Sequence, residues 1–247
     1  MIEVTDLTVG YASQPILSNL TINFEPGKIT GIIGPNGAGK STLIKGILGL
    51  IKRQGGLVEL NGDPIAARLK NIAYVEQRAA LDLSFPINVF DTVLTGTYPK
   101  LGLFKNPTMV DKKAVEGALN TVKLSDFGER QIGELSGGQL QRVFVARAIV
   151  QAADVIILDE PFVGIDMKSE AEIMAVFKAW QAVGKTIIVV HHDLNKVTSY
   201  FDNLAIINRG IIAHGPTQEV FNKANITKAF SGDLSAILFE GEERQDA

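Results

Sequence analysis

The sequence predicts an α/β fold with a mostly parallel sheet, an antiparallel β edge and a helical subdomain insertion. Three observations lead to this prediction. Short β-branched strands alternate with helical segments at both ends of the chain, as in βαβ units. The segments 155–158 and 186–190 are almost entirely apolar, as strands covered on both faces must be. Between the strand-rich parts, residues 79–150 carry only helical periodicity.

The N-terminal part predicts strand, loop and helix in that order. Its first strands are β-branched runs separated by turn residues such as Pro26-Gly27, and they span 2–9, 22–24 and 29–33. From Lys40, apolar residues recur every three or four positions, which predicts a helix that ends near Gly55. Two more short strands are predicted at 57–60 and 72–75.

The middle and the end of the chain complete the domain prediction. Helical periodicity is found at 89–94, 112–122 and 139–150. A βαβ unit follows, with its helix at 168–182, and a last pair of strands is predicted at 204–207 and 211–213. We therefore expect a core formed by 1–78 and 151–247, with a helical subdomain at 79–150.

Composition narrows the function classes. The 247 residues include 46% hydrophobic and 21% charged residues, which is typical of a folded globular chain. The formal net charge of −3 provides no global basic field for nucleic acid. The absence of Cys excludes disulfides and thiolate chemistry. No apolar stretch is long enough to span a bilayer, so we expect any membrane role to require a partner.

A glycine-rich motif follows the third predicted strand and precedes the first predicted helix. It is Gly34-Pro35-Asn36-Gly37-Ala38-Gly39-Lys40-Ser41-Thr42. Glycines let successive backbone N–H groups point inward, and the helix N-terminus adds partial positive charge, so this loop predicts a polyphosphate site. Lys40 is expected to reach the β- and γ-phosphates, and the Ser41 hydroxyl to bind Mg²⁺. The alternative is a glycine-rich turn with an exposed Lys.

Two acids, Asp159 and Glu160, end the apolar strand at 155–158. The carboxyl edge of an α/β sheet is where ligands bind, so Asp159 is expected to hold Mg²⁺. Side chains that leave a strand in succession diverge, so Glu160 is free to face an attacking water as general base. The alternative for this acidic pair is a helix N-cap.

A second anion site is indicated by the segment Leu135-Ser136-Gly137-Gly138-Gln139-Leu140-Gln141-Arg142, in which a Ser and two glycines open a helix. Together with the glycine-rich loop, this segment resembles the ATP-binding subunits of ABC transporters, whose signature motif reads Leu-Ser-Gly-Gly-Gln. The resemblance covers essentially the whole chain. It implies a P-loop ATPase core with bound ATP and Mg²⁺, in which the signature of one copy closes over the nucleotide of the other.

Further residues match the family pattern in order. The resemblance implies that Tyr11 stacks on adenine, although a surface Tyr is the alternative. It implies that Gln77 senses Mg²⁺ and the γ-phosphate, and that His192 contacts the γ-phosphate. Asp166 belongs to the loop that crosses the dimer, where many relatives have Ala-Leu-Asp rather than Gly-Ile-Asp. His191 is expected to be packed or solvated, since the sequence has too few His residues for a convincing zinc site.

The finer resemblance is to the bacterial importers of manganese, zinc or iron, and most closely to the manganese importers. Segments such as Ser84-Phe85-Pro86 and His191-His192-Asp193-Leu194 carry it. It implies a peripheral subunit at the cytoplasmic face of the membrane. The implied partners are a second copy, an integral membrane permease and, indirectly, an extracellular or periplasmic metal-binding protein; no nucleic acid is expected.

The helical region 79–135, which starts at Gln77, is expected to present a groove for a short helix of the permease. Its apolar wall is predicted to comprise Phe85, Ile87, Val89, Phe90, Leu101, Leu103 and Phe104, with core packing as the alternative for most of them. A zinc or iron-chelate importer and a soluble ABC ATPase without a channel remain open alternatives. A switch GTPase is disfavoured, because Asn195-Lys196-Val197-Thr198 lacks the acid that reads guanine.

Overall fold

The computed structural model describes residues 1–11, 14–77, 83–101 and 105–230. They form two compact units, and each is described by itself. Unit 1 comprises Met1–Leu69 and Ile188–Ala247, and unit 2 comprises Lys70–Ile187. This grouping does not test the predicted insertion at 79–150, which stays a prediction.

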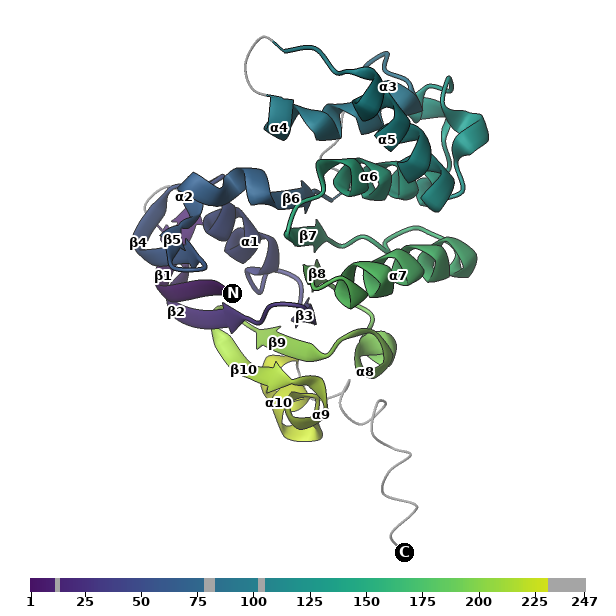
Figure 1. The fold of residues 1–247 in the computed structure, drawn as a ribbon. Helices are drawn as coiled ribbons and strands as arrows, with labels where there is room; N and C mark the ends of the chain where they lie inside the picture. Colours follow the sequence, from purple (N-terminus) through teal and green to yellow (C-terminus); the bar gives the residue numbers. More distant parts are fainter. Residues whose placement is uncertain (12–13, 78–82, 102–104, 231–247) are drawn as a thin grey trace, which may run out of the picture. The chain divides into compact units, whose positions relative to one another are not determined.

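Unit 1 contains an antiparallel four-stranded sheet in the order β2-β1-β4-β5 (Figure 1). Its strands are β1 (Ile2–Tyr11), β2 (Gln14–Phe24), β4 (Arg53–Leu60) and β5 (Asp63–Pro64). Ile2 pairs with Phe24 on one side and Leu60 on the other, which confirms the predicted antiparallel edge. β2 is longer than the predicted strand at 22–24, because Gln14, Pro15, Leu17 and Leu20 also pair with β1.

The strand, glycine-rich loop and helix predicted for the N-terminal part also lie in unit 1. β3 (Ile29–Ile33) is buried throughout and pairs in parallel with β9 (Asn203–Ile207), and β10 (Ile211–Pro216) runs antiparallel to β9. Helix α1 (Lys40–Leu48) packs against β1 and β2. It ends earlier than predicted, because Gly49 adopts a left-handed conformation and its N–H donates to carbonyls of the last turn.

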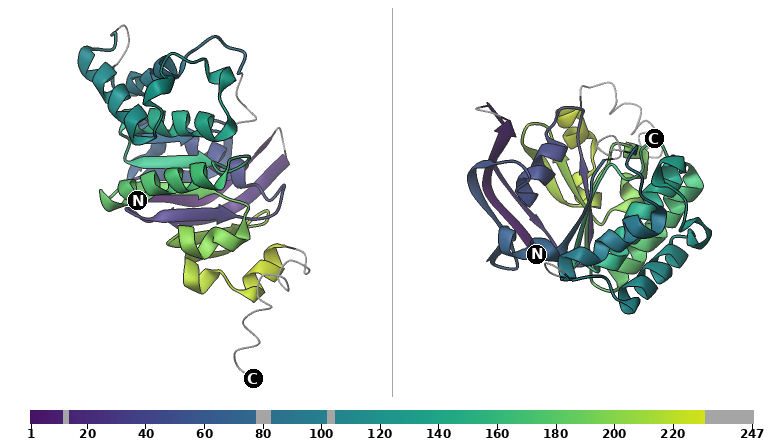
Figure 2. Two further views of the ribbon diagram at one scale, coloured as in Figure 1. Left: turned by 90° about the vertical axis from the view of Figure 1, so that its right-hand side faces the viewer. Right: turned by 90° about the horizontal axis from the view of Figure 1, so that it is seen from above.

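Short helices complete unit 1. They are α2 (Ile65–Arg68), α8 (Val197–Tyr200), α9 (Thr217–Val220) and α10 (Lys223–Ala229). α9 and α10 lie beside β9 and β10 (Figures 1 and 2). Within the described residues, short 3₁₀ helices of both units lie at Leu69–Asn71, Thr95–Thr97, Ser125–Phe127, Ile132–Glu134 and Leu194–Lys196.

Unit 2 combines parallel strands with a group of helices. β6 (Ile72–Val75) pairs in parallel with β7 (Val155–Asp159), and β8 (Thr186–Val190), which begins in this unit, is buried throughout. The helices are α3 (Val89–Leu94), α4 (Tyr98–Leu101), α5 (Met109–Thr121), α6 (Gly137–Gln151) and α7 (Met167–Ala182). α3, α5 and α7 all contact α6 (Figure 1). These elements confirm the predicted α/β class with its parallel strands and its group of helices.

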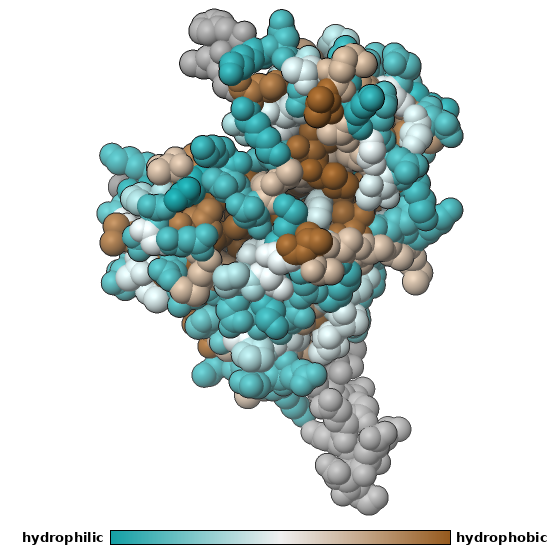
Figure 3. Space-filling model, viewed as in Figure 1, coloured by the Kyte–Doolittle hydropathy of each residue, from teal (hydrophilic) through white to brown (hydrophobic). Residues whose placement is uncertain are grey.

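Hydrophobic side chains on the face shown in Figure 3 form small groups between hydrophilic ones. Within the described ranges, the helices all lack the length and apolar character that a bilayer crossing requires.

Candidate functional site

The glycine-rich loop joins β3 to α1 in unit 1. Gly37 and Gly39 have φ angles of 78° and 97°, in the left-handed region that a glycine tolerates and other residues rarely adopt. Gly39 is the N-cap of α1, and no side chain caps the first turn there. The Ala38 carbonyl accepts the Arg209 N–H at 3.0 Å, which anchors the loop beyond the end of β9. The loop therefore presents an uncapped helix N-terminus, the backbone feature that binds phosphate.

Lys40 lies inside this loop rather than in solvent. Its side chain is buried, and Nζ donates to the carbonyl oxygens of Gly34 at 2.8 Å and Pro35 at 3.1 Å. The predicted alternative of an exposed Lys is therefore wrong. A polyphosphate would offer the ammonium charged acceptors in place of neutral carbonyls, and hydrogen bonds to charged groups are the stronger ones.

Ser41 and Thr42 lie in the first turn of α1, and two further predicted ligand residues of unit 1 lie at or just after strand ends. Tyr11 ends β1 and its side chain is 52% exposed, which leaves the ring accessible to a flat ligand. His192 follows β8 and is exposed. Its neighbour His191 is buried, with its ring centroid 5.5 Å from that of Phe201 in an edge-on contact. His191 is thus packed, one of the two states expected for it.

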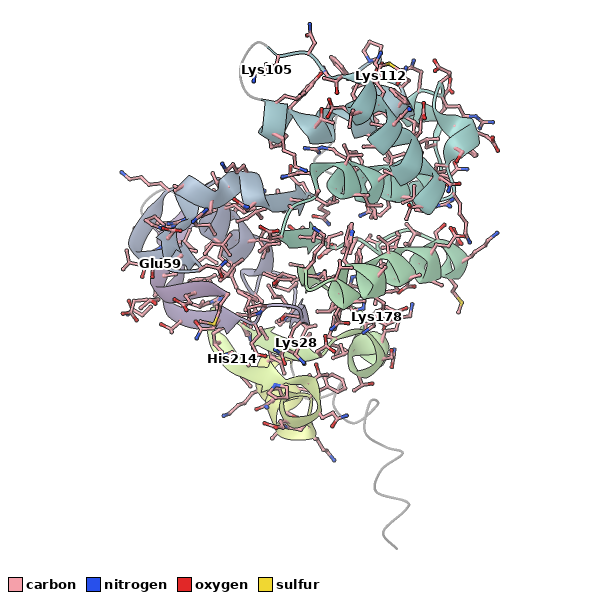
Figure 4. All side chains as sticks on the ribbon, viewed as in Figure 1. Lys28, Glu59, Lys105, Lys112, Lys178 and His214 are labelled. Atoms are coloured by element: carbon pink, nitrogen blue, oxygen red, sulfur yellow. The ribbon has the colours of Figure 1, made fainter. Side chains whose placement is uncertain are left out.

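The remaining histidine, His214, lies on β10 opposite Ala205 (Figure 4). Among the residues that the structure describes, no group of three His, Asp or Glu side chains is arranged to hold a metal ion by itself.

Unit 2 brings Gln77 and Glu160 together. The Gln77 Nε2 group donates to Glu160 Oε2 at 2.7 Å, across a gap of 83 positions in the sequence. Glu160 has a φ of 52°, an uncommon left-handed conformation for a side chain of its size. Such strain persists only where surrounding contacts hold the residue in place, and it is found most often at functional sites. The sequence indicated both residues, but not their contact.

Asp159 ends β7 and is 3% exposed. The alternative reading of Asp159 and Glu160 as a helix N-cap is wrong, because the next helix, α7, begins later and is capped by Asp166. A carboxylate at the end of a buried strand can supply oxygen ligands to a cation, and carboxylate oxygen is a ligand that Mg²⁺ prefers.

The signature segment begins α6, as the sequence predicts. Ser136 is the N-cap: its Oγ accepts the Gln139 N–H at 3.3 Å, and Gln139 Oε1 accepts the Ser136 N–H at 2.9 Å. This reciprocal capping box fixes the turn 136–139, which we call the signature turn. Ser136 is exposed at the surface of unit 2, while Gly138 is buried.

Asp166 lies on an exposed loop and caps α7. Its carboxylate accepts the Ser169 N–H at 2.9 Å and the Ser169 hydroxyl at 2.8 Å. These two hydrogen bonds, the backbone one foremost, hold the pKa of Asp166 below its usual range because they favour the charged form. Sequence reasoning missed Ser169, although a hydroxyl three residues after an N-cap Asp is a recognisable signal.

The predicted apolar wall is only partly exposed. The Phe85 side chain is 62% exposed, and Ile87, Phe90 and Leu101 are half-buried. Val89 is fully buried and packs in the core, as the alternative reading held. Leu103 and Phe104 lie outside the described residues.

Comparison with known sequences gives matches along most of the chain. The model of the ABC transporter family matches residues 17–163. The manganese transport system ATP-binding protein MntB of Listeria monocytogenes is 52% identical, over 97% of this chain and 99% of the relative. The zinc transport system ATP-binding protein TroB of Treponema pallidum is 43% identical, over 99% of this chain and 92% of the relative.

Solved structures give the same fold. A structure titled as an inward-facing metal-chelate type ABC transporter superposes with a TM-score of 0.81 at 26% identity, covering 93% of this chain and 88% of that one. The dimeric structure of a bacterial ABC transporter cassette gives a TM-score of 0.75 at 25% identity, covering 87% of this chain and 98% of that one.

Proposed function

The chain belongs to the ABC transporter family as an ATP-hydrolysing subunit, and we propose that it powers the import of a divalent transition metal, manganese, through a membrane permease. The observation that carries the proposal is the likeness to manganese transport ATP-binding proteins along nearly the whole length of both chains. No residue of this chain needs to touch the metal, which is its cargo. The likeness to the zinc transport protein makes zinc the second candidate.

We propose that unit 1 binds the nucleotide. The loop 34–42 offers its backbone N–H groups to the phosphates, and Lys40 exchanges the Gly34 and Pro35 carbonyls for phosphate oxygens. Tyr11 stacks on the adenine, which its exposed ring permits. His192, also exposed, donates to the γ-phosphate.

The oxygen ligands proposed for Mg²⁺ are the Ser41 hydroxyl, the Gln77 carbonyl and the Asp159 carboxylate. All three supply the hard oxygen donors that this ion selects, so the residues fit the cofactor. When bound, Mg²⁺ supplies neutralisation of the charge on the β- and γ-phosphates. The Gln77 carbonyl oxygen stays available while its amide donates to Glu160, because the two groups are separate atoms of one side chain.

Glu160 is proposed as the general base that accepts the proton of the attacking water. A general base must hold its carboxylate toward the water whose proton it accepts. The Gln77 contact at 2.7 Å therefore keeps Glu160 oriented before nucleotide binds.

The active centre is proposed to be shared between two copies of the chain, related head to tail. Ser136, Gly137, Gly138 and Gln139 of one copy would close over the nucleotide of the other, and Asp166 would cross to it. Exposure of Ser136 and Asp166 on unit 2 supports this proposal. The solved cassette that is dimeric supports pairing of two copies.

The proposed location is the cytoplasmic face of the cell membrane, where the chain binds a permease. Phe85, which is 62% exposed, is the residue of the predicted wall best placed for that contact. A metal-binding protein outside the membrane would deliver the cargo to the permease.

Transport by the assembled system tests this function. The chain, its permease and the metal-binding protein are reconstituted together in vesicles supplied with ATP and Mg²⁺, and uptake of Mn²⁺, Zn²⁺ and an iron chelate is measured separately. We expect Mn²⁺ uptake with the unchanged chain and none with the Glu160→Gln variant. Uptake of Zn²⁺ alone would transfer the assignment to zinc, and ATP hydrolysis without uptake of any of them would contradict metal import.

A further inference from the structure

Helices α6 and α7 of unit 2 contact each other (Figure 1). Their N-terminal ends meet at Gly138. A Cβ atom at Gly138 would lie 2.7 Å from Ser169 Cβ and 3.2 Å from Asp166 Oδ2. The first distance is shorter than real Cβ contacts, so a larger residue would force the helix ends apart. Gly138 therefore allows the signature turn to lie directly against the start of α7.

Ser169 is the residue that fills this junction. Its side chain is 6% exposed, and it contacts Gly138 on one side and Asp166 on the other. Its N–H and its hydroxyl donate to different oxygens of the Asp166 carboxylate. Two donors on two oxygens fix the rotation of a carboxylate, which a single hydrogen bond leaves free.

We infer that Ser169 is a positioning residue that holds the signature turn and Asp166 as one rigid surface for contact with the second copy. The inference rests on the proposed function, which places both segments against the partner. Because this surface is ordered before the copies meet, less conformational freedom is lost when they associate. Ser169 itself touches neither nucleotide nor partner in this role.

A purely structural role makes a different prediction. Ser169→Ala keeps the backbone N–H that caps α7 through Asp166 Oδ1 and removes only the hydroxyl. If Ser169 only stabilised α7, this variant would change the thermal unfolding midpoint without any separate effect on association. If it positions the surface, association weakens while unfolding changes little.

The experiment uses the full chain with Glu160→Gln, which lets an ATP-bound dimer accumulate. The monomer–dimer Kd is measured by sedimentation with ATP and Mg²⁺, with and without Ser169→Ala. We expect Ser169→Ala to raise this Kd roughly three- to tenfold, the effect of one lost hydrogen bond. Nucleotide affinity of the dilute monomer should not change.

Thr108→Ala is the matched control, because it also removes a hydroxyl that donates to a carboxylate at the start of a helix of unit 2. It should leave the dimer Kd unchanged. In the active chain, Ser169→Ala should raise the protein concentration needed for half-maximal ATPase rate and leave the KM for ATP unchanged.

The two ways of failing are distinct. A parent that dimerises with ATP and a Ser169→Ala variant with the same Kd would overturn the positioning role alone. A parent that never dimerises with ATP and Mg²⁺ would overturn both the shared active centre and the inference built on it.

Discussion

At the scale of single residues, the pair Gln77 and Glu160 carries most of the chemistry of unit 2. The left-handed backbone of Glu160 costs conformational energy, and the hydrogen bond from Gln77 is a contact that offsets part of this cost. The side chain proposed as base is therefore held in a defined orientation rather than sampling solvent. Lys40 is similar in unit 1, because its own loop holds the ammonium in place.

The first prediction concerns Glu160 itself. Glu160→Gln removes the proton acceptor but keeps the size and a hydrogen-bonding oxygen, so ATP should still bind while hydrolysis falls by about 10²–10⁴-fold. Phosphate release and nucleotide binding are measured on the same preparation. Glu129→Gln, a change of an exposed Glu in the same unit, should leave both unchanged. Normal phosphate release by Glu160→Gln would rule out its role as base.

At the scale of elements, four helices of unit 2 begin with a side-chain cap, the first being α3 with Asn88. Thr108 caps α5, Ser136 caps α6 and Asp166 caps α7. α1 in unit 1 differs, since Gly39 gives it no side-chain cap. Among the described helices of nine or more residues, the one proposed to hold phosphate is thus the one without a side-chain cap, so its first N–H groups are left for a ligand.

The cap of α5 gives a prediction about pH. The hydroxyl and N–H of Thr108 both donate to Asp111 at 2.7 Å, and they lower the pKa of that carboxyl. A lowered folded-state pKa contributes stability that is present above the ordinary carboxyl pKa and is lost as pH falls through the lowered value. Thr108→Ala should therefore lower the unfolding free energy at neutral pH, by an amount that shrinks in acid below about pH 4.

Denaturant unfolding at several pH values measures this effect. Thr121→Ala on the same helix is the control, because its hydroxyl donates to the Gly117 carbonyl and no carboxylate is involved. The loss of unfolding free energy caused by Thr121→Ala should not depend on pH in this range. An equal pH dependence for both variants would mean that the Thr108–Asp111 contact does not stabilise α5 through charge.

At the scale of the whole molecule, the proposed activity belongs to two copies rather than one. The glycine-rich loop 34–42, which is proposed to bind phosphate, lies in unit 1, and Ser136 of the signature turn is exposed on unit 2. A site that draws one part from each copy is completed only when the copies associate. The ATPase rate per chain should then rise with protein concentration.

Ser136→Arg tests this sharing. Arginine at this exposed position would block close approach of a second copy. The glycine-rich loop 34–42 lies elsewhere in the sequence, so the contacts of Lys40 within it are kept. We expect the dilute monomer to retain its affinity for ATP. The ATPase rate at high protein concentration should fall at least tenfold, which corresponds to a free-energy change of about 1.4 kcal/mol in association or in the activation barrier. Ser125→Arg, also exposed in unit 2, should behave as the unchanged chain. Loss of ATP binding by the monomer would show that Ser136 acts within its own copy.

The sequence by itself determined the α/β class, the phosphate loop, the buried strand that ends at Asp159 and the helix start at Ser136. These features can be recognised from spacing along the chain. Apolar periodicity distinguishes a helix from a strand, and the local spacing of Gly, Ser and carboxylate residues identifies the motifs. It also indicated the family, which the comparisons confirm. The domain boundaries at 78 and 151 and the roles of the individual site residues stay predictions.

Only the tertiary structure decided the contacts between residues that are distant in sequence. Gln77 donates a hydrogen bond to Glu160, which lies 83 positions away in the sequence. Gly138 lies against Ser169 because the N-terminal ends of α6 and α7 are adjacent. It also decided that Lys40 is buried on its own loop, that Val89 belongs to the core and that α1 stops at Leu48. Such outcomes depend on which surfaces pack in three dimensions, and local periodicity carries no information about a partner far along the chain.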